Sequence, residues 1–275
     1  MSGPPRHGAR RVARAAALAA GCMAGALAVG WAERGRGEGA RCGNGFAPRD
    51  FRCLVPEGTC PSPLEWSTHG CDAPDRRVLV HETTLVIGPS DWEADGRVVA
   101  RTIHVDAFRI DAFETTEGRW RNAEGRDASR AASGMTRDEA SAFCASRHGR
   151  LPSEDEWIAA AASGTSPARR YPWGDTGAVC RRAAWGLLGG PCGVGARGPD
   201  TVGAHVDGDS PLGVHDLAGN VAEWVGADDG RGRIGIAKGG SWQSPLATEL
   251  RIWSRLEIEP GARDVRVGVR CAYPA

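Results

Sequence analysis

The residues of this chain that could bind a metal or carry redox chemistry are its nine cysteines and seven histidines. Four cysteines fall in a short segment with the spacing C-x10-C-x6-C-x10-C: Cys42, Cys53, Cys60 and Cys71. A structural zinc site favours two close pairs with about two to four residues between the partners, and this spacing contains no such pair. We therefore interpret the segment as a small module held by disulfides, for which three pairings remain open.

The histidines form no metal-binding pattern in the sequence. His81, His104, His148, His205 and His215 include no pair at the spacing that places two imidazoles on one helix face. A position at the surface or in a turn is the commoner explanation for each of them. A site assembled from distant histidines stays open, but no spacing predicts one.

The balance of charge excludes partners that are bound mainly by a basic field. The chain has 34 Lys and Arg residues against 34 Asp and Glu residues, so its formal net charge at pH 7 is zero. Nucleic acids attract strongly basic proteins, and we expect no nucleic-acid partner. The 39 glycines and 10 tryptophans predict a loop-rich domain with Trp side chains in its core.

An export signal is expected at the N-terminus. An arginine-rich segment at residues 6–14 precedes an apolar run at residues 15–32. This order is typical of a signal peptide or an uncleaved membrane anchor, to which we assign residues 1–35, and lipidation at Cys22 is a third alternative. The rest of the chain is then expected in the periplasm, at the cell surface or secreted. The eight cysteines beyond Cys22 agree with an oxidising compartment.

The character of the chain changes after Pro74, and this divides it into a cysteine-rich module at residues 36–76 and a main domain at residues 77–275. Near the start of the main domain, residues 76–88 and 97–116 alternate apolar and polar side chains, as half-buried strands do. These two segments predict the first strands of the domain.

Two capping boxes predict two short helices. In each box a hydroxyl side chain caps the first turn, and a glutamate three residues later bonds back to the cap. The boxes are Thr136 with Glu139 and Ser153 with Glu156, and the helices are expected to end at Gly149 and Gly164. Residues 164–224 then carry repeated turn signals with little periodicity, whereas residues 233–242 and 265–273 are typical of closing strands.

Six sequence blocks follow one another in order between residues 78 and 273. They are FRIDAFETT, EASAFCASRHGRLPSEDEWIAAAASG, YPWGD, PLGVHDLAGNVAEW, KGGSW and VGVRC. Together they resemble the blocks of the formylglycine-generating enzyme family, also called sulfatase-modifying factor domains, and six ordered blocks are far more specific than one motif. The resemblance implies an α+β fold: the loop-rich, C-type-lectin-like variant of the sulfatase-modifying factor fold, here preceded by the small disulfide-rich module.

The resemblance also implies one disulfide. Cys144, after the first capping box, and Cys271, at the end of the last block, are similar to a cysteine pair of the family, and their bond would tie a helix to the C-terminal strand. Cys180 and Cys192 are then left over and close in sequence, so we expect them to form a local loop staple.

Enzymes of the resembled family carry two cysteines shortly after the GGS block, which hold copper(I) and the substrate thiol. In this chain Ser244, Ala247 or Glu249 stands where those thiols would align. Copper(I) needs soft thiolate ligands, and a hydroxyl or a carboxylate does not replace them. We therefore expect no copper, assign no catalytic residue, and predict that formylglycine-generating activity is absent.

The block LAGNVAEW is similar to one that supplies a structural calcium site in the family. By that similarity the carbonyls of Ala218, Gly219 and Val221 and the carboxylate of Glu223 would bind calcium, which prefers oxygen ligands from irregular loops. The alternative is that Asn220 and Glu223 only satisfy buried amides of the loop.

These observations favour an exported, non-catalytic binding module, a pseudoenzyme that displays loops to a protein, peptide or glycan. The alternative is a metal-dependent oxidase of the same family, either formylglycine-generating or using non-haem iron. Trp173, Trp185 and Trp242 have side chains suited to stacking on such a ligand, but packing in the core is the commoner role of this residue.

Overall fold

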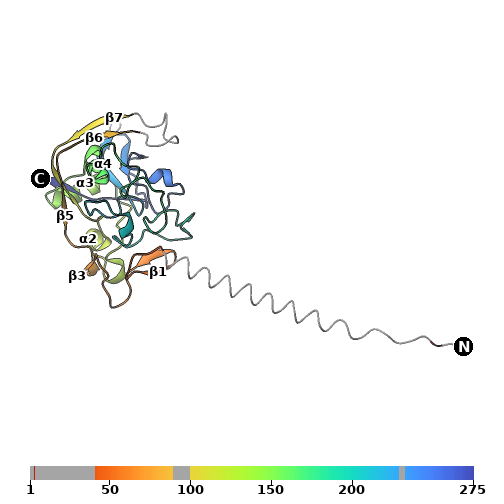
Figure 1. The fold of residues 1–275 in the computed structure, drawn as a ribbon. Coiled ribbons are helices and arrows are strands. Elements are labelled where there is room, and N and C mark those ends of the chain that lie inside the picture. Colours follow the sequence, from red (N-terminus) through yellow and green to blue (C-terminus); the bar gives the residue numbers. More distant parts are fainter. Residues whose placement is uncertain (1–2, 4–40, 89–99, 229–232) are drawn as a thin grey trace. The chain divides into compact units, whose positions relative to one another are not determined.

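The computed structural model describes residue 3 and residues 41–88, 100–228 and 233–275 (Figure 1). Residues 41–275 form one compact unit. The export signal expected at residues 1–35 lies outside the described residues, apart from residue 3. Within the described segments, no helix combines the length and the apolar character needed to cross a membrane.

Short strands and three short α-helices make up the regular structure of the described residues. The helices are α2 (Glu117–Arg121), α3 (Arg137–Ser146) and α4 (Glu154–Ala162), with 3-10 turns η1 (Gly125–Asp127), η2 (Val206–Gly208) and η3 (Ala247–Leu250). The strands are β1 (Ala47–Arg49), β2 (Arg52–Leu54), β3 (Glu65–Ser67), β4 (Gly70–Asp72), β5 (Arg77–Val80), β6 (Thr83–Ile87), β7 (Arg101–Val105), β8 (Phe108–Asp111), β9 (Gly189–Gly190), β10 (Gly193–Val194), β11 (Ala222–Asp228), β12 (Gly235–Lys238), β13 (Leu256–Ile258), β14 (Val267–Gly268) and β15 (Ala272–Pro274).

The strands pair in several small sheets rather than in one large one. A four-stranded sheet has the order β13-β12-β11-β14, in which only β11 and β14 are parallel. A three-stranded antiparallel sheet has the order β15-β8-β5, so the C-terminus pairs with the start of the main domain. The remaining pairs are the hairpins β1-β2, β3-β4, β6-β7 and β9-β10. These elements form the α+β arrangement expected from the sequence.

Strand β11 was not expected, because its first residues belong to the segment interpreted as loop. Ala222, Glu223, Trp224 and Val225 are all buried, so this strand shows no alternation of exposed and buried positions. A strand that is buried on both faces and begins in a turn-rich segment gives no period-two signal in the sequence.

Both capping boxes form as expected. The Thr136 hydroxyl accepts from the Glu139 amide at 3.2 Å, and the Ser153 hydroxyl accepts from the Glu156 amide at 3.1 Å. These contacts satisfy amides at the starts of α3 and α4 that have no partner within the helix. Helix α4 contributes Trp157 to the main core and lies beside the β6-β7 hairpin (Figure 1).

The end of α3 differs from the expectation. His148, not Gly149, adopts the left-handed conformation, with φ at 61°. Gly149 is required for another reason: a Cβ there would lie 2.6 Å from the Tyr273 ring and 2.8 Å from the Ala272 carbonyl. Strand β15 therefore passes too close to this turn for any side chain.

The cysteine-rich segment packs against the main domain. Its disulfides join Cys42 to Cys53 and Cys60 to Cys71, which is one of the three open pairings. Three of its apolar side chains, Phe46, Val55 and Leu64, share a buried cluster with Phe113 and Val202 of the main domain. Thus the described part of the module does not stand apart from the later chain.

Candidate functional site

Within the glycine-rich stretch at residues 237–251, the chain makes a tight turn directly after β12. Gly239 and Gly240 have φ values of 94° and 71°, and a Cβ on Gly239 would lie 2.9 Å from the Leu217 carbonyl. The Ser241 amide then donates to the Ser244 hydroxyl at 3.0 Å, and the Ser244 amide donates back to the Ser241 carbonyl. The turn is therefore closed by local bonds.

The three residues expected in place of catalytic thiols lie in and just before η3. Ser244 is buried and caps the turn described above. The Ala247 carbonyl accepts from the Tyr171 hydroxyl at 3.2 Å, and the Glu249 amide donates to the Leu246 carbonyl at 3.1 Å. These contacts hold the loop in place, and none of the three side chains supplies a soft ligand.

Every cysteine that the structure describes is in a disulfide. Besides the two N-terminal bonds, Cys144 is joined to Cys271 and Cys180 to Cys192, the pairs expected from the sequence. No cysteine occurs between Cys192 and Cys271. Consequently the described part of the chain offers no free thiol to a soft metal.

Lys238, the only lysine, lies at the end of β12 directly before this turn. It is fully buried, and its ammonium lies 3.2 Å from a carboxylate oxygen of Glu154, which also accepts from Arg255. Burial lowers the pKa of Lys238 to about 8, although Glu154 opposes this shift. The lysine therefore links β12 to the first turn of α4 at some cost in desolvation.

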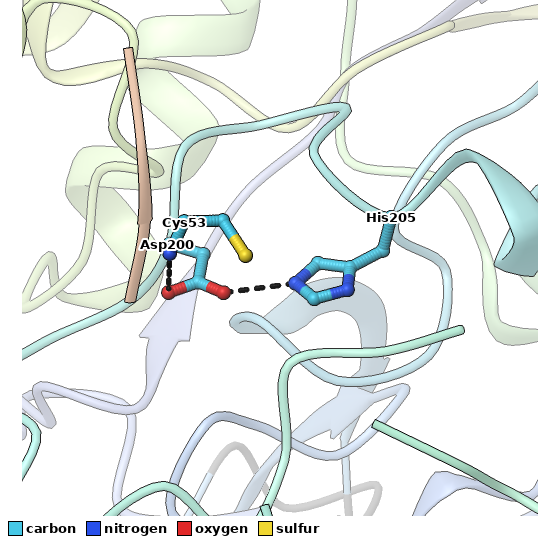
Figure 2. Close-up of side chains that lie close together, drawn as sticks. All are labelled: Cys53, Asp200 and His205. Carbon is cyan, nitrogen blue, oxygen red and sulfur yellow. Dashed lines mark hydrogen bonds and ion pairs between the residues drawn. The ribbon is translucent and has the colours of Figure 1, made fainter. Parts of the chain in front are cut away.

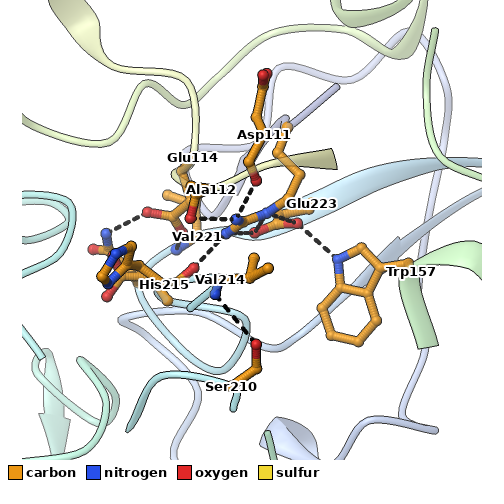
Figure 3. Close-up of polar contacts among 12 residues, drawn as sticks. Asp111, Ala112, Glu114, Trp157, Ser210, Val214, His215, Val221 and Glu223 are labelled. Carbon is orange, nitrogen blue, oxygen red and sulfur yellow. Dashed lines mark hydrogen bonds and ion pairs between the residues drawn. The ribbon is translucent and has the colours of Figure 1, made fainter. Parts of the chain in front are cut away.

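Glu223, the expected calcium ligand, forms a buried ion pair with Arg270. Figure 3 shows Glu223 with the Trp157 indole directed toward its carboxylate. The Arg270 Nε donates to both carboxylate oxygens at 2.9 and 2.8 Å, and its Nη2 donates to Oε1 at 2.7 Å. The Trp157 indole donates to Oε2 at 2.7 Å. All three side chains are at most 1% exposed, and both carboxylate oxygens are already bonded within the protein.

Arg270 also organises the surrounding backbone. Its Nη1 donates to the Asp111 and Ala112 carbonyls, each at 3.1 Å, and its Nη2 donates to the His215 carbonyl at 2.7 Å. One guanidinium thus joins the end of β8, the loop before β11 and the C-terminal segment. Satisfied donors of this kind fix a single arrangement of a loop-rich core.

Glu114 accepts hydrogen bonds from two other residues of the expected calcium loop. It accepts from the Asn220 side chain at 2.6 Å and from the Val221 amide at 3.0 Å. Burial, reinforced by the charges of Asp216 and Glu223, raises the pKa of Glu114 well above its usual value. Asn220 also accepts from the Asp200 amide at 2.8 Å, so it satisfies buried backbone as the alternative interpretation proposed.

The groups that contact Glu223 suit an ion pair better than a calcium site. The carbonyls of Ala218, Gly219 and Val221 lie in the loop as expected, but a calcium ion would have to replace a guanidinium at Glu223. The groups around Glu223 therefore do not fit a calcium ion as they stand, and calcium binding stays a prediction.

A second buried polar cluster was not foreseen from the sequence. Figure 2 shows Cys53, Asp200 and His205, whose possible metal-binding atoms lie within 4.8 Å of one another. The His205 Nε2 lies 2.8 Å from an Asp200 oxygen, and the Cys53 amide donates to the other oxygen at 3.0 Å. Because Cys53 is bonded to Cys42, only the aspartate and the histidine remain as ligands, which is too few for a metal centre of these side chains alone.

The other histidines do not join this cluster among the described residues. His215 stacks on Phe113 with 4.3 Å between ring centroids, and its Nδ1 lies 2.8 Å from Asp209. His81, His104 and His148 are exposed. Tertiary packing decides which of these histidines are buried beside an acid, and the spacing of histidines in the sequence carried no signal for it.

The tryptophans considered as stacking platforms are mostly core residues. Trp185 and Trp242 are 6% and 4% exposed, and Trp173 stacks on Tyr171 with 4.9 Å between centroids. The sequence reasoning missed Trp66, which is 66% exposed on β3. The sequence signal that could have indicated exposure is a single Trp between two polar residues, Glu65 and Ser67.

Comparison with known proteins shows which proteins this chain is similar to. The profile described as "Sulfatase-modifying factor enzyme 1-like domain" matches residues 121–275. The chain is 33% identical over 163 residues to "Hercynine oxygenase" of Mycolicibacterium thermoresistibile, covering 50% of this chain and 35% of the relative. It is 31% identical over 150 residues to "Inactive C-alpha-formylglycine-generating enzyme 2" of Bos taurus, covering 50% and 48%. The chain thus aligns with about a third to a half of these relatives.

A solved structure supports the fold. Treponema denticola variable protein 1 superposes with a TM-score of 0.60 at 18% identity, covering 78% of this chain and all of that one. The expected fold, a loop-rich C-type-lectin-like variant of the sulfatase-modifying factor fold, is confirmed. At 18% identity, the structural similarity supports the fold alone.

Proposed function

Because the chain belongs to the family of sulfatase-modifying factor enzyme 1-like domains, we propose that it is an exported binding module of that family without oxidase activity. Its ligand would be a protein, a peptide or a glycan held by surface loops. The names of two relatives correspond to the two possible functions, an active enzyme and an inactive one: one relative is named as an oxygenase and the other as inactive.

The observation that carries this proposal is the chemistry of the turn after Ser241. Copper(I) oxidation of a thiol needs thiolate ligands, and this turn offers the Ser244 hydroxyl and the Glu249 carboxylate. All eight described cysteines are oxidised in pairs, so no described thiol can move in to replace them. Hard oxygen groups at this position do not support formylglycine generation.

Export is supported by the disulfides and by the N-terminal sequence. Four disulfides indicate an extracellular or otherwise oxidising environment. The arginine-rich segment and apolar run at residues 6–32 have the order of an export signal. We propose that the chain leaves the cytoplasm by this signal and oxidises its cysteines afterwards.

Iron-dependent oxidation is the second candidate, favoured by the similarity to hercynine oxygenase. Non-haem iron sites commonly use two histidines and a carboxylate. Two carboxylate–histidine pairs separated by 2.8 Å occur among the described residues, Asp200 with His205 and Asp209 with His215. Neither pair has a second described histidine beside it, and the first is buried at 0% and 1% exposure, where a substrate would have no access.

Disulfide mapping by mass spectrometry, combined with metal analysis and an activity assay, tests the proposal. We expect all eight cysteines from Cys42 to Cys271 to be bridged, copper and iron to be absent at stoichiometric levels, and a sulfatase-type cysteine peptide to stay unconverted when copper is added. Conversion of the peptide would refute the non-catalytic function. Stoichiometric iron in the purified protein would instead revive the second candidate.

A further inference from the structure

A cleft in the cysteine-rich segment is a separate feature that the family resemblance does not explain. It has a volume of about 490 Å³. Its lining includes Val55, Glu57, Thr59, Trp66, Gly125 and Arg126, so it lies where the cysteine-rich segment meets η1 of the main domain. Strand β3, which contributes Trp66 to the lining, is labelled in Figure 1. We propose that this cleft binds a neutral saccharide, with Trp66 as the stacking platform.

Trp66 is the only described tryptophan that is mainly exposed. Its side chain is 66% exposed, whereas Trp157, Trp224 and Trp242 are at most 4% exposed. An exposed indole next to a cavity offers a flat apolar face with a polar edge. The C–H face of a sugar ring matches such a surface.

The platform is held rigidly by the hairpin that carries it. Trp66 pairs across the hairpin with Cys71, which is bonded to Cys60. The Ser67 hydroxyl closes the turn by donating to the Gly70 carbonyl at 2.9 Å and accepting from the His69 amide at 3.1 Å. A site that is already ordered loses little conformational entropy when a ligand binds.

The main domain contributes Gly125 and Arg126 to the lining and is tied to the hairpin there. The Gly125 amide donates to the His69 carbonyl at 3.0 Å, which joins η1 to the β3-β4 hairpin. A Cβ on Gly58 or on Gly125 would meet no atom within 4 Å. Both glycines therefore leave open space and bare backbone at the cleft.

The polar groups of the cleft are paired and carry no net charge. An oxygen of Glu57 lies 3.3 Å from the guanidinium of Arg126, and their side chains are 90% and 43% exposed. A carboxylate accepts hydrogen bonds and a guanidinium donates them, so adjacent hydroxyls of a sugar can bond to both. The Thr59 hydroxyl lies in the same lining and adds a further acceptor.

This combination favours a neutral saccharide over a charged ligand. An anion would face Glu57 and a cation would face Arg126, and in either case one charge of the pair repels it. The volume lies within the usual range for a small-molecule site, roughly 300–1,000 Å³. The inference rests on the proposed binding function and specifies one site and one ligand class for it.

The test is NMR of the full ¹⁵N-labelled chain with four neutral disaccharides: cellobiose, maltose, lactose and N,N′-diacetylchitobiose. The Trp66 indole signal is assigned by its loss in Trp66→Phe. We expect at least one sugar, at up to about 50 mM, to shift this signal in a saturable way, as weak sites of this size do.

Variants measured by sugar-observed saturation transfer complete the test. Trp66→Ala is expected to weaken binding roughly tenfold, because it removes the stacking face, and Trp66→Phe much less. Glu57→Gln is expected to weaken it about threefold by removing a charge-assisted bond. Val194→Ala, at a residue that is 66% exposed on β10 and outside the cleft lining, is the matched control and should bind normally.

Two outcomes would overturn the proposal: no shift of the Trp66 indole with any of the four sugars, or binding that survives Trp66→Ala unchanged. Neither refutes the non-catalytic binding function, which is tested separately by the metal and cysteine-peptide assays. Conversely, a sugar bound at Trp66 together with peptide oxidation would refute that function and leave the cleft standing.

Discussion

The buried pair of Glu223 and Arg270 offers the sharpest test of how this core is built. Glu223→Gln removes one charge with almost no change in size, and the new side-chain carbonyl can still accept from the Trp157 indole. What it cannot do is balance the charge of Arg270, which donates three bonds to this carboxylate and is fully buried. The variant therefore isolates the electrostatic part of the pair.

The expected loss follows from this burial. Removing one partner of a buried ion pair costs about 3–5 kcal/mol, and because the indole keeps an acceptor we expect about 3 kcal/mol for Glu223→Gln. Arg270→Met should cost more, since it also leaves the carbonyls of Asp111, Ala112 and His215 without this donor. The double variant should lose at least about 2 kcal/mol less than the sum of the two single losses.

Urea unfolding with the disulfides intact measures these values, with Glu57→Gln as the control for an exposed charge, expected within about 0.5 kcal/mol of the parent. A loss below about 1 kcal/mol for Glu223→Gln, or strictly additive losses, would refute the reasoning. The same experiment with 5 mM calcium tests the metal hypothesis. Stabilisation by calcium that disappears in Glu223→Gln would assign this carboxylate to calcium instead of Arg270.

Two further predictions concern pH and the disulfides. Burial gives Lys238 a pKa of about 8 against 10.5 for an unburied lysine, so between these values the unfolded chain binds more protons, and stability should rise with pH by about 3 kcal/mol. Lys238→Met should abolish this rise in urea unfolding between pH 7.5 and 10.5, and an equal rise in the variant would contradict the assignment. Replacing Cys144 and Cys271 by Ala, with a separation of 127 residues, should cost about 5 kcal/mol, and replacing Cys180 and Cys192, with a separation of 12, about 3 kcal/mol. Thermal and urea unfolding would rank the two, and the reverse order would show that loop entropy does not dominate.

Features that depend on neighbouring residues were predictable. The capping boxes at Thr136 and Ser153 formed because each hydroxyl and its glutamate lie three residues apart, within one helical turn. The expected end of α3 at Gly149 was only partly right. The glycine is needed because β15 passes against it, and that contact joins residues more than a hundred positions apart.

Charged residues inside the core were beyond sequence reasoning. The sequence predicts Glu223 as a calcium ligand, whereas in the structure this residue pairs with Arg270, which lies 47 positions away and carries no local mark in the sequence. Asp200 and His205 are close in sequence, but their burial depends on the cysteine-rich segment that packs over them. Pairing of distant charges follows from packing, which no periodicity encodes.

The family, the fold class, the two helix starts and the lack of cysteine in the turn after Ser241 follow from the sequence, because ordered blocks, capping boxes and residue identities are local properties. In contrast, tertiary packing brings Glu223 to a guanidinium and leaves Trp66 exposed beside a cleft that Arg126 also lines. The Glu223–Arg270 pair and the exposure of Trp66 both depend on which distant parts of the chain pack together. The hydrophobic effect drives that packing, but it is non-directional and leaves no periodic pattern in the sequence that names the contacting residues.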